Sequence, residues 1–172
     1  MRFVATIIPH VARILIVGGG ARARGLTGEL VARGHAVRVT TRTAKGRSAI
    51  EAAGGECWIA TPDRIASLRY ALENVTIACW LLGTARGSRE ELEALHGPRL
   101  AFFCSQAIDT TVRGLIYEAA GCVDADLLES GADLVATTAA YNEIPLCIIT
   151  ADPADATTWR AGARAAIDSL LG

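Results

Sequence analysis

Features that mark membrane proteins, metal sites and nucleic-acid-binding surfaces are scarce in this sequence. The longest uncharged apolar run, 75–82, is far shorter than the roughly 20 residues of a membrane-spanning helix. The formal net charge of −1 favours neither nucleic acid nor an acidic membrane surface as a partner. The five cysteines include no C-x-x-C pair and the three histidines have no metal-ligand spacing, so we expect no disulfide framework and no metal site.

Lysine and secretion signals are scarce as well. Lys45 is the only lysine, so arginine supplies nearly all of the basic charge. Pro9 and His10 interrupt the apolar N-terminal segment and no cleavage pattern follows, which predicts a cytoplasmic protein. All five cysteines have apolar neighbours, and we expect them to be buried as small hydrophobic residues.

Short apolar segments that alternate with helical patterns are abundant. Among 172 residues, 51% of them hydrophobic, β-rich runs occur at 13–17, 36–41, 57–59, 75–82, 114–118 and 146–150. Helical patterns lie between them, for example at 45–53, 64–73 and 124–142, with a break expected at Gly131. Ser88 and Glu91 form a capping-box pattern that begins another helix.

This alternation predicts an α/β fold with one doubly wound parallel sheet of about six strands in the order 3-2-1-4-5-6. The strands and helices occupy a single domain from 12 to 172. Residues 1–11 are expected to be an N-terminal extension outside that domain.

A glycine-rich loop follows the first predicted strand and begins the first predicted helix. It fits the pattern G-x-G-x-x-A through Gly18, Gly20 and Ala23. Gly18 permits a sharp turn, Gly20 lets the backbone approach a pyrophosphate, and a small residue at 23 lets the helix pack close to the strand. Gly19 and Arg22 complete the expected phosphate-binding loop. The alternative interpretation is a tight turn that binds nothing.

The end of the second predicted strand indicates which dinucleotide is bound. NAD-binding proteins usually place a carboxylate there for the ribose 2′-hydroxyl, but this sequence has Thr41 and Arg42 and no carboxylate before Glu51. Since a guanidinium can bind a 2′-phosphate with two hydrogen bonds, we expect NADP, with NAD as the alternative. Arg42 as a solvated surface residue is the other interpretation.

Five segments, 14–20, 34–42, 75–83, 112–118 and 142–146, resemble the short-chain dehydrogenase/reductase superfamily. The resemblance is to its atypical or extended branches, the NAD-dependent epimerase/dehydratase and NmrA-like proteins. It implies a Rossmann fold that binds NAD(P), and an oxidoreductase or epimerase activity.

The sequence departs from that superfamily at its catalytic positions. Ala119 and Ala120 stand where the resemblance implies a catalytic serine, and the Tyr-x-x-x-Lys pair has no match because Pro145 lies four residues after Tyr141. The only lysine lies elsewhere, and because the predicted strands and helices take up nearly all of 12–172, we expect no separate substrate subdomain. Whether the protein is an enzyme is therefore left open.

Any substrate is expected at the carboxyl ends of the central strands, where parallel sheets of this order bind ligands. Leu82, Gly83 and Thr84 follow the fourth strand and are expected to contact the cofactor. Glu118, at the end of the fifth strand, is the candidate general acid or base. The alternative is that this carboxylate pairs with a nearby arginine.

Three hypotheses follow from these patterns. The first is an NADP-dependent, oxidoreductase-like enzyme that acts on an unidentified small molecule. The second is a regulatory module that senses NAD(P) without turnover, and the third is a structural domain without a cofactor. The patterns leave a homo-oligomer open.

Overall fold

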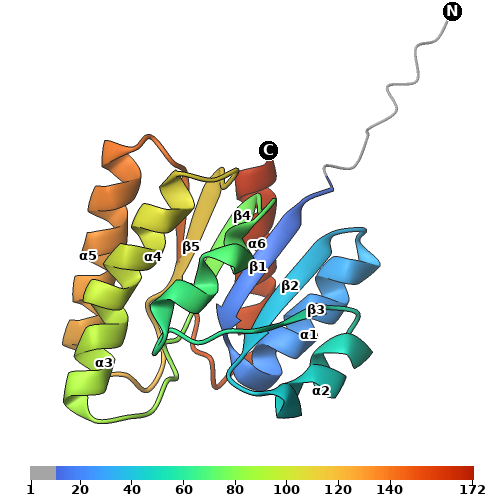
Figure 1. The fold of residues 1–172 in the computed structure, drawn as a ribbon, viewed down its shortest axis with the longest axis horizontal. Coiled ribbons are helices and arrows are strands. Elements are labelled where there is room, and N and C mark those ends of the chain that lie inside the picture. The colour runs from blue at the N-terminus through green and yellow to red at the C-terminus, as the bar shows by residue number, and fades with distance from the viewer. Residues whose placement is uncertain (1–10) are drawn as a thin grey trace, which may run out of the picture.

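The computed structural model describes residues 11–172, so the expected extension at 1–11 lies almost entirely outside the described residues. Six parallel strands form one sheet in the order β3-β2-β1-β4-β5-β6, which confirms the predicted fold (Figure 1). The strands are β1 (Arg13–Gly18), β2 (Ala36–Thr41), β3 (Glu56–Ile59), β4 (Ile77–Leu81), β5 (Gly114–Glu118) and β6 (Leu146–Ile149).

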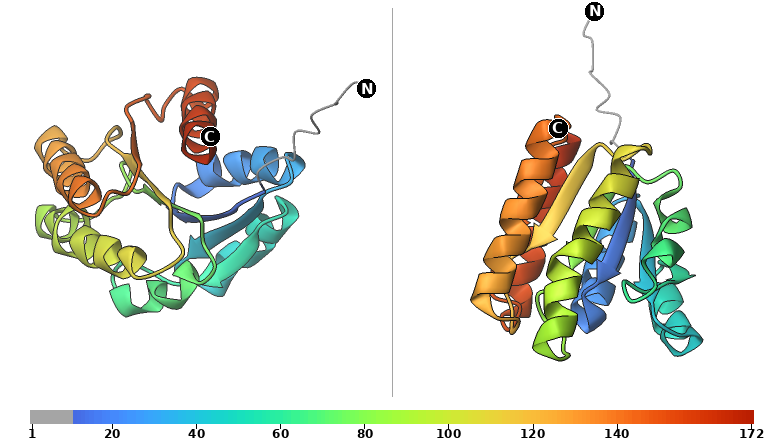
Figure 2. Two further views of the ribbon diagram at one scale, coloured as in Figure 1. Left: turned by 90° about the horizontal axis from the view of Figure 1, so that it is seen from above. Right: turned by 60° about the vertical axis from the view of Figure 1, so that its left-hand side comes forward.

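Helices cover both faces of the sheet (Figure 2). One face is covered by α1 (Gly20–Ala32), α2 (Arg47–Ala52) and α6 (Ala156–Leu171). The other is covered by α3 (Arg89–His96), α4 (Pro98–Ile108) and α5 (Ala125–Tyr141). None of the helices within 11–172 is both long and apolar enough to cross a bilayer.

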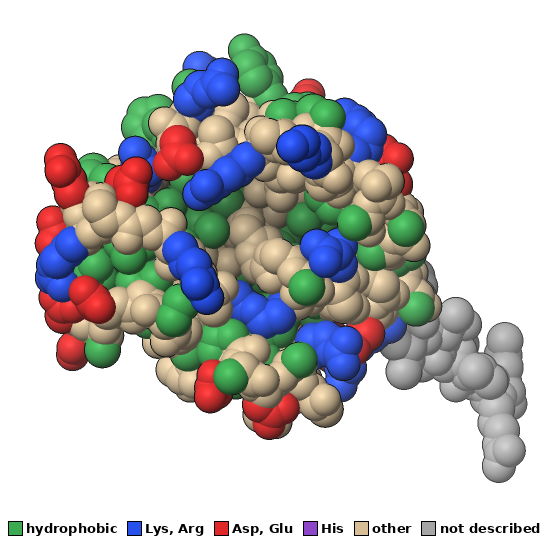
Figure 3. Space-filling model, turned by 90° about the horizontal axis from the view of Figure 1, so that it is seen from below, with side chains coloured by type: hydrophobic (Ala, Val, Ile, Leu, Met, Phe, Trp, Pro, Cys, Tyr) green, Lys and Arg blue, Asp and Glu red, His purple; other side chains and the backbone are tan. Residues whose placement is uncertain are grey.

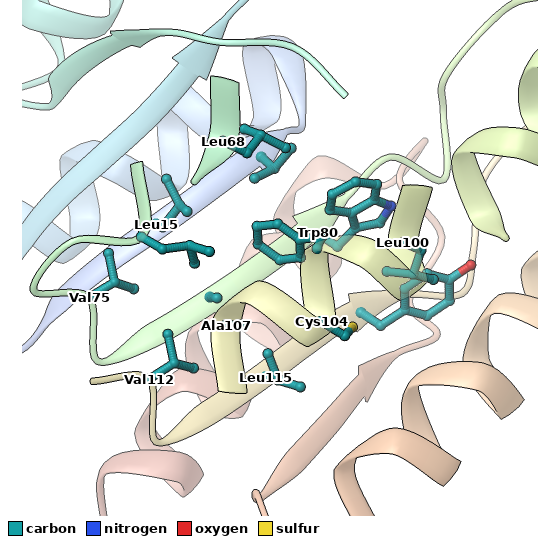
Figure 4. Close-up of a cluster of buried hydrophobic side chains, with 14 of the residues drawn as sticks. Leu15, Leu68, Val75, Trp80, Leu100, Cys104, Ala107, Val112 and Leu115 are labelled. Carbon is teal, nitrogen blue, oxygen red and sulfur yellow. The ribbon is translucent and has the colours of Figure 1, made fainter. Parts of the chain in front are cut away.

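The core lies on both faces of the two central strands. Residues 14–17 of β1 are fully buried, and their side chains alternate between the two faces. On the α4 side Leu15 packs in a cluster with Trp80 and Phe103, whose ring centroids are 4.8 Å apart. Figure 4 shows this cluster, with Leu100, Cys104 and Leu115 around it.

The helix ends follow local rules that the sequence predicts. Ser88 and Glu91 form the expected capping box, in which each side chain binds the other residue's backbone N–H. Gly34 ends the first helix with φ of +94° and donates to the carbonyl of Val31 at 2.9 Å. These contacts span only a few residues, which is why the sequence alone indicates them.

The prediction of a helix at 64–73 is wrong. The segment instead forms two 3₁₀ turns, Ile65–Leu68 and Tyr70–Leu72. The buried guanidinium of Arg38, in β2, donates hydrogen bonds to two backbone carbonyls of this segment, Ala71 at 2.6 Å and Glu73 at 3.1 Å. Asn74 then turns the chain with φ of +59°. A long-range contact from a neighbouring strand thus replaces the i→i−4 ladder of a helix.

Gly131 does not break α5, which runs through it. The absence of a side chain at this position leaves room for a neighbouring aromatic ring. A Cβ at this glycine would overlap the hydroxyl of buried Tyr117. That hydroxyl lies 2.7 Å from Nδ1 of His96 at the end of α3. His96 is buried although it is the last residue of its helix.

The cysteines differ from the expectation in one place. Cys79 and Cys104 are buried, and burial raises the pKa of the Cys104 thiol to about 12. Cys57 and Cys147 are half-buried, whereas Cys122, in the loop after β5, is exposed. The prediction of burial is therefore wrong for Cys122, because its apolar neighbours pack while its own side chain does not.

Two glycine-to-alanine substitutions should have opposite effects on stability. Gly131→Ala should lower the free energy of unfolding by about 1–3 kcal/mol, because the new methyl group overlaps Tyr117. Gly28→Ala in α1 should raise it by roughly 0.5–1 kcal/mol, since only the Ala53 carbonyl lies near, at 3.9 Å. Urea unfolding of both variants measures this. Equal effects would contradict the packing described for α5.

The buried His96 should make stability fall in mild acid. Burial lowers the pKa of His96 below its ordinary value of 6.5, and its interaction with the Leu82 backbone offsets part of this. The unfolded chain therefore takes up the proton first, and stability is lost as pH falls from about 6.5 through the lowered pKa. His96→Gln should flatten this part of the profile in urea unfolding at pH 5–8.

His35→Gln is the matched control. Burial lowers the pKa of His35 too, but that side chain is only partly buried. Its substitution should therefore change the slope less than His96→Gln does. A wild-type profile without any slope between pH 5 and 6.5 would contradict the argument.

Candidate functional site

The loops that follow the parallel strands meet at the carboxyl edge of the sheet, the lower edge of Figure 1. Figure 3 views the molecule from this side, and Lys and Arg side chains surround a hollow near its centre, which we call the crevice. Most Asp and Glu side chains in this view lie toward the rim. Lys and Arg side chains thus border the edge where parallel sheets bind ligands.

The glycine loop has the geometry of a phosphate-binding turn. Gly18 and Gly19 have φ of +87° and +82°, and a Cβ at Gly19 would lie 2.8 Å from that of Ala23. Gly18 is equally confined, because a Cβ there would lie 2.7 Å from the Leu81 carbonyl. A Cβ at Gly20, by contrast, would have nothing within 4 Å. The first two glycines are therefore required for packing, while the third borders open space.

The start of α1 lies beside that open space and leaves backbone donors available. The N–H groups of Arg22 and Ala23 bond to the Gly19 carbonyl at 3.1 and 3.2 Å, so the available N–H groups are those of Gly20 and Ala21 before them. The N–H groups at the start of a helix have no intrahelical partner, and the helix dipole makes this end positive. No acidic side chain lies in the first turn. The loop can therefore accept a phosphate through its backbone.

Arg22 and Glu118 form a buried ion pair beside the loop. Arg22 Nη1 and Nη2 both bond to the Glu118 carboxylate, Nη2 at 3.4 Å, and Nη2 also donates to Thr84 Oγ1 at 2.8 Å. The Glu118 side chain has no exposed surface. It also accepts from the Gly83 N–H at 2.8 Å and from Trp159 Nε1 at 2.7 Å. Arg22 lies over the Trp159 ring, 4.5 Å from its centroid.

This arrangement bears on the roles expected for both residues. Each oxygen of Glu118 already accepts at least two hydrogen bonds, and no surface of the side chain faces a ligand. The environment favours the alternative interpretation, a carboxylate that pairs with a nearby arginine. Both terminal nitrogens of Arg22 are engaged as well, so the geometry favours backbone groups over this side chain as the phosphate ligands.

The loops after β4 and β5 cross at close range. A Cβ at Gly83 would overlap the Ala120 carbonyl, and one at Gly121, where φ is +147°, would overlap the Gly83 carbonyl. Val123 N–H donates to that same Gly83 carbonyl at 3.1 Å. Gly83 is thus closely packed where these two loops meet, and the Leu82 side chain lies against Gly18. The expectation that both residues contact a cofactor stays a prediction.

Thr41 is the last residue of β2 and Arg42 follows it, on the opposite side of β1 from β4. Arg42 is 68% exposed, and its nearest carboxylate is Asp63, 3.8 Å away. Asp63 also accepts a hydrogen bond from Arg99 at 2.8 Å, so two arginines share its negative charge. Thr41 Oγ1 donates to the Thr43 carbonyl at 3.1 Å. Arg42 is therefore free to turn toward an added anion.

Two residues at this edge are not indicated by the sequence patterns. Trp159 belongs to the apolar stripe of α6, and only its indole N–H distinguishes it from the other core residues. Asp63 approaches Arg42 because β2 and β3 are neighbours in the sheet. Within residues 11–172, no three His, Cys, Asp or Glu side chains lie close enough together to hold a metal ion.

Comparison with known proteins identifies the fold. No family model matches the sequence, and no curated protein is similar enough to count as a relative. Solved structures do match, among them a short-chain dehydrogenase/reductase superfamily protein from Agrobacterium tumefaciens with bound NAD. It shares 15% identity at a TM-score of 0.65, over 80% of this chain and 48% of that one.

Two further structures show the same relation. The UDP-glucuronic acid 4-epimerase of Bacillus cereus, in complex with NAD, has a TM-score of 0.64 at 12% identity, over 80% of this chain and 55% of its own. The vestitone reductase of alfalfa, Medicago sativa, has a TM-score of 0.61 at 16% identity, over 81% and 56%. The chain thus spans about half the length of these proteins, with which it shares the Rossmann-type fold.

Breaking the buried ion pair should destabilise the protein strongly. Glu118→Gln leaves the Arg22 guanidinium largely buried without a counter-charge, which should cost about 3–5 kcal/mol of unfolding free energy. Arg22→Met together with Glu118→Gln removes both charges and should cost less than Glu118→Gln alone. Urea unfolding of the two single variants and the double variant measures the coupling. Strictly additive losses would contradict the pairing.

Proposed function

We propose that this protein binds a nicotinamide dinucleotide, NADP in preference to NAD, at the carboxyl edge of its sheet. The observation that carries the proposal is the open space at Gly20, directly before the first turn of α1. The space lies beside β1 and β4, where the strand order reverses and where doubly wound sheets bind nucleotides.

The residues of the crevice suit a dinucleotide in a definite orientation. Backbone N–H groups at the start of α1 would hold the pyrophosphate, and the Ala23 methyl keeps α1 close to β1. Arg42 would hold the 2′-phosphate, because it is exposed and its approach to Asp63 is long. The nicotinamide half would then lie toward Thr84 and Arg22. When bound, the cofactor supplies hydride transfer.

A second candidate is nucleotide sensing without turnover. Glu118, the one carboxylate at the end of β5, is enclosed by its donors, and alanines follow it at 119 and 120. Proton transfer to a substrate needs an acid or base within hydrogen-bond reach of it. This environment favours sensing over the proton relay of a typical short-chain dehydrogenase/reductase.

Titration with NADPH and NADH tests the cofactor and its preference. NADPH should bind more tightly, and Arg42→Ala should weaken NADPH binding about tenfold while leaving NADH nearly unchanged, because only the 2′-phosphate meets that guanidinium. Tryptophan fluorescence and the shift in thermal midpoint follow the binding. If neither nucleotide gives a saturable signal, both the enzyme and the sensor hypotheses fail. Tighter binding of NADH would contradict only the role of Arg42.

Gly20→Val should remove nucleotide binding by filling the space before α1. A β-branched residue at φ of +52° also costs about 1–2 kcal/mol, so some loss of stability is expected. Gly28→Ala, farther along α1, is the matched control and should bind NADPH as the wild type does.

If NADPH binds, oxidation of it with a panel of quinones and carbonyl compounds separates an enzyme from a sensor.

A further inference from the structure

A cavity of about 350 Å³ adjoins the proposed cofactor crevice on the side of β4, β5 and β6. Arg22 and Thr84 line it and also belong to the crevice. Its outer wall comes from the loop after β4 with Arg86, the loop after β5 with Cys122, and the loop before α6 with Pro153. Its volume lies within the range of about 300–1,000 Å³ that is usual for small-molecule sites.

The charges around this cavity leave one arginine without a partner. The charge of Arg22 is balanced by Glu118. The carboxylate of Asp152 accepts from the Ala154 N–H at 2.9 Å, within its own turn. Arg86 is exposed, and it has no ion pair or side-chain hydrogen bond among residues 11–172. The lining therefore holds two charged groups without an ion pair among residues 11–172, the Arg86 guanidinium and the Asp152 carboxylate, and of these only the guanidinium can bind an anion.

We infer that this cavity binds a small organic oxyanion, whose carboxylate or phosphate ester group pairs with Arg86 and whose apolar part lies against Pro153. Arg86 can form two parallel hydrogen bonds with either group, which an uncharged ligand cannot match. The role of this anion as substrate or effector beside a nucleotide depends on the proposed function. Its binding to the free protein does not.

Cys122 serves as a reporter because it is the exposed cysteine and it lines the cavity. The experiment compares its alkylation by anionic iodoacetate and by neutral iodoacetamide, followed by peptide mass spectrometry without nucleotide. The iodoacetate-to-iodoacetamide rate ratio should exceed the ratio for free cysteine. Arg86→Gln should lower the ratio about threefold, as expected for an exposed pair of charges.

Arg33→Gln is the matched control, since it removes the same charge at the far end of α1, where Arg33 pairs with Asp168. This variant should leave the ratio unchanged. Unfolding curves of both variants show whether each is folded. A ratio equal to that of free cysteine, or one that Arg86→Gln does not alter in a folded protein, would overturn the inference.

Protection experiments then identify the ligand group. Butyrate and propyl phosphate should slow the iodoacetamide reaction of Cys122 in a saturable way, and butyramide, which is uncharged, should not. The anion that protects Cys122 at the lower concentration identifies carboxylate or phosphate as the preferred group. Arg86→Gln should weaken the protection. Equal protection by butyramide would overturn the assignment to an anion.

The outcome is separable from that of the proposed function. Anion protection in a protein that binds no nucleotide would support the cavity and contradict the proposed function. Saturable NADPH binding without any anion effect at Cys122 would overturn this inference and leave the proposed function standing.

Discussion

The buried ion pair between Arg22 and Glu118 is the interaction on which the carboxyl edge of the sheet depends. It connects the first turn of α1 to β5, and the same carboxylate also binds the Gly83 backbone and the Trp159 indole of α6. A buried charge that loses its partners costs several kcal/mol. The relative positions of α1, α6 and the loop after β4 are therefore coupled through one side chain.

This coupling divides the crevice into two unlike halves. On the β2 side the space before Gly20 is open and Arg42 is mostly exposed, so the structure can admit a ligand there without breaking a contact. On the β5 side the guanidinium of Arg22 is held in place by Glu118, Thr84 and Trp159. A nucleotide would thus meet adaptable groups at one end and a fixed, planar cation at the other.

The fold could be predicted because its determinants are local and periodic. The apolar runs of β1 and β4, the glycine turn at Gly34 and the capping box at Ser88 each depend on residues close in sequence. The 3₁₀ turns at 65–72, which Arg38 holds through two carbonyls, depend on a contact from another strand. No pattern within 64–73 contains that information, so the sequence indicated a helix there.

The geometry of the glycine turn could be predicted for the same reason, whereas the surroundings of Glu118 could not. Gly18 and Gly20 are recognisable because the turn and its spacing are local. The partners of Glu118 come from residues 22, 83 and 159, and only the folded chain brings them together. A glutamate at the end of a strand has the same sequence pattern whether it is a catalytic group or an enclosed counter-ion.

That enclosure bears on what a bound cofactor could do. Hydride transfer to a carbonyl needs a proton donor beside the accepting oxygen, and hydride transfer alone needs only a close approach of the two carbons. Glu118 is committed to its four donors, while Thr84 Oγ1 already accepts from Arg22. Donating a proton from Glu118 would require the ion pair to open, and α1 and α6 would then lose their common anchor. The interaction that shapes the site therefore opposes catalysis by the residue that forms it.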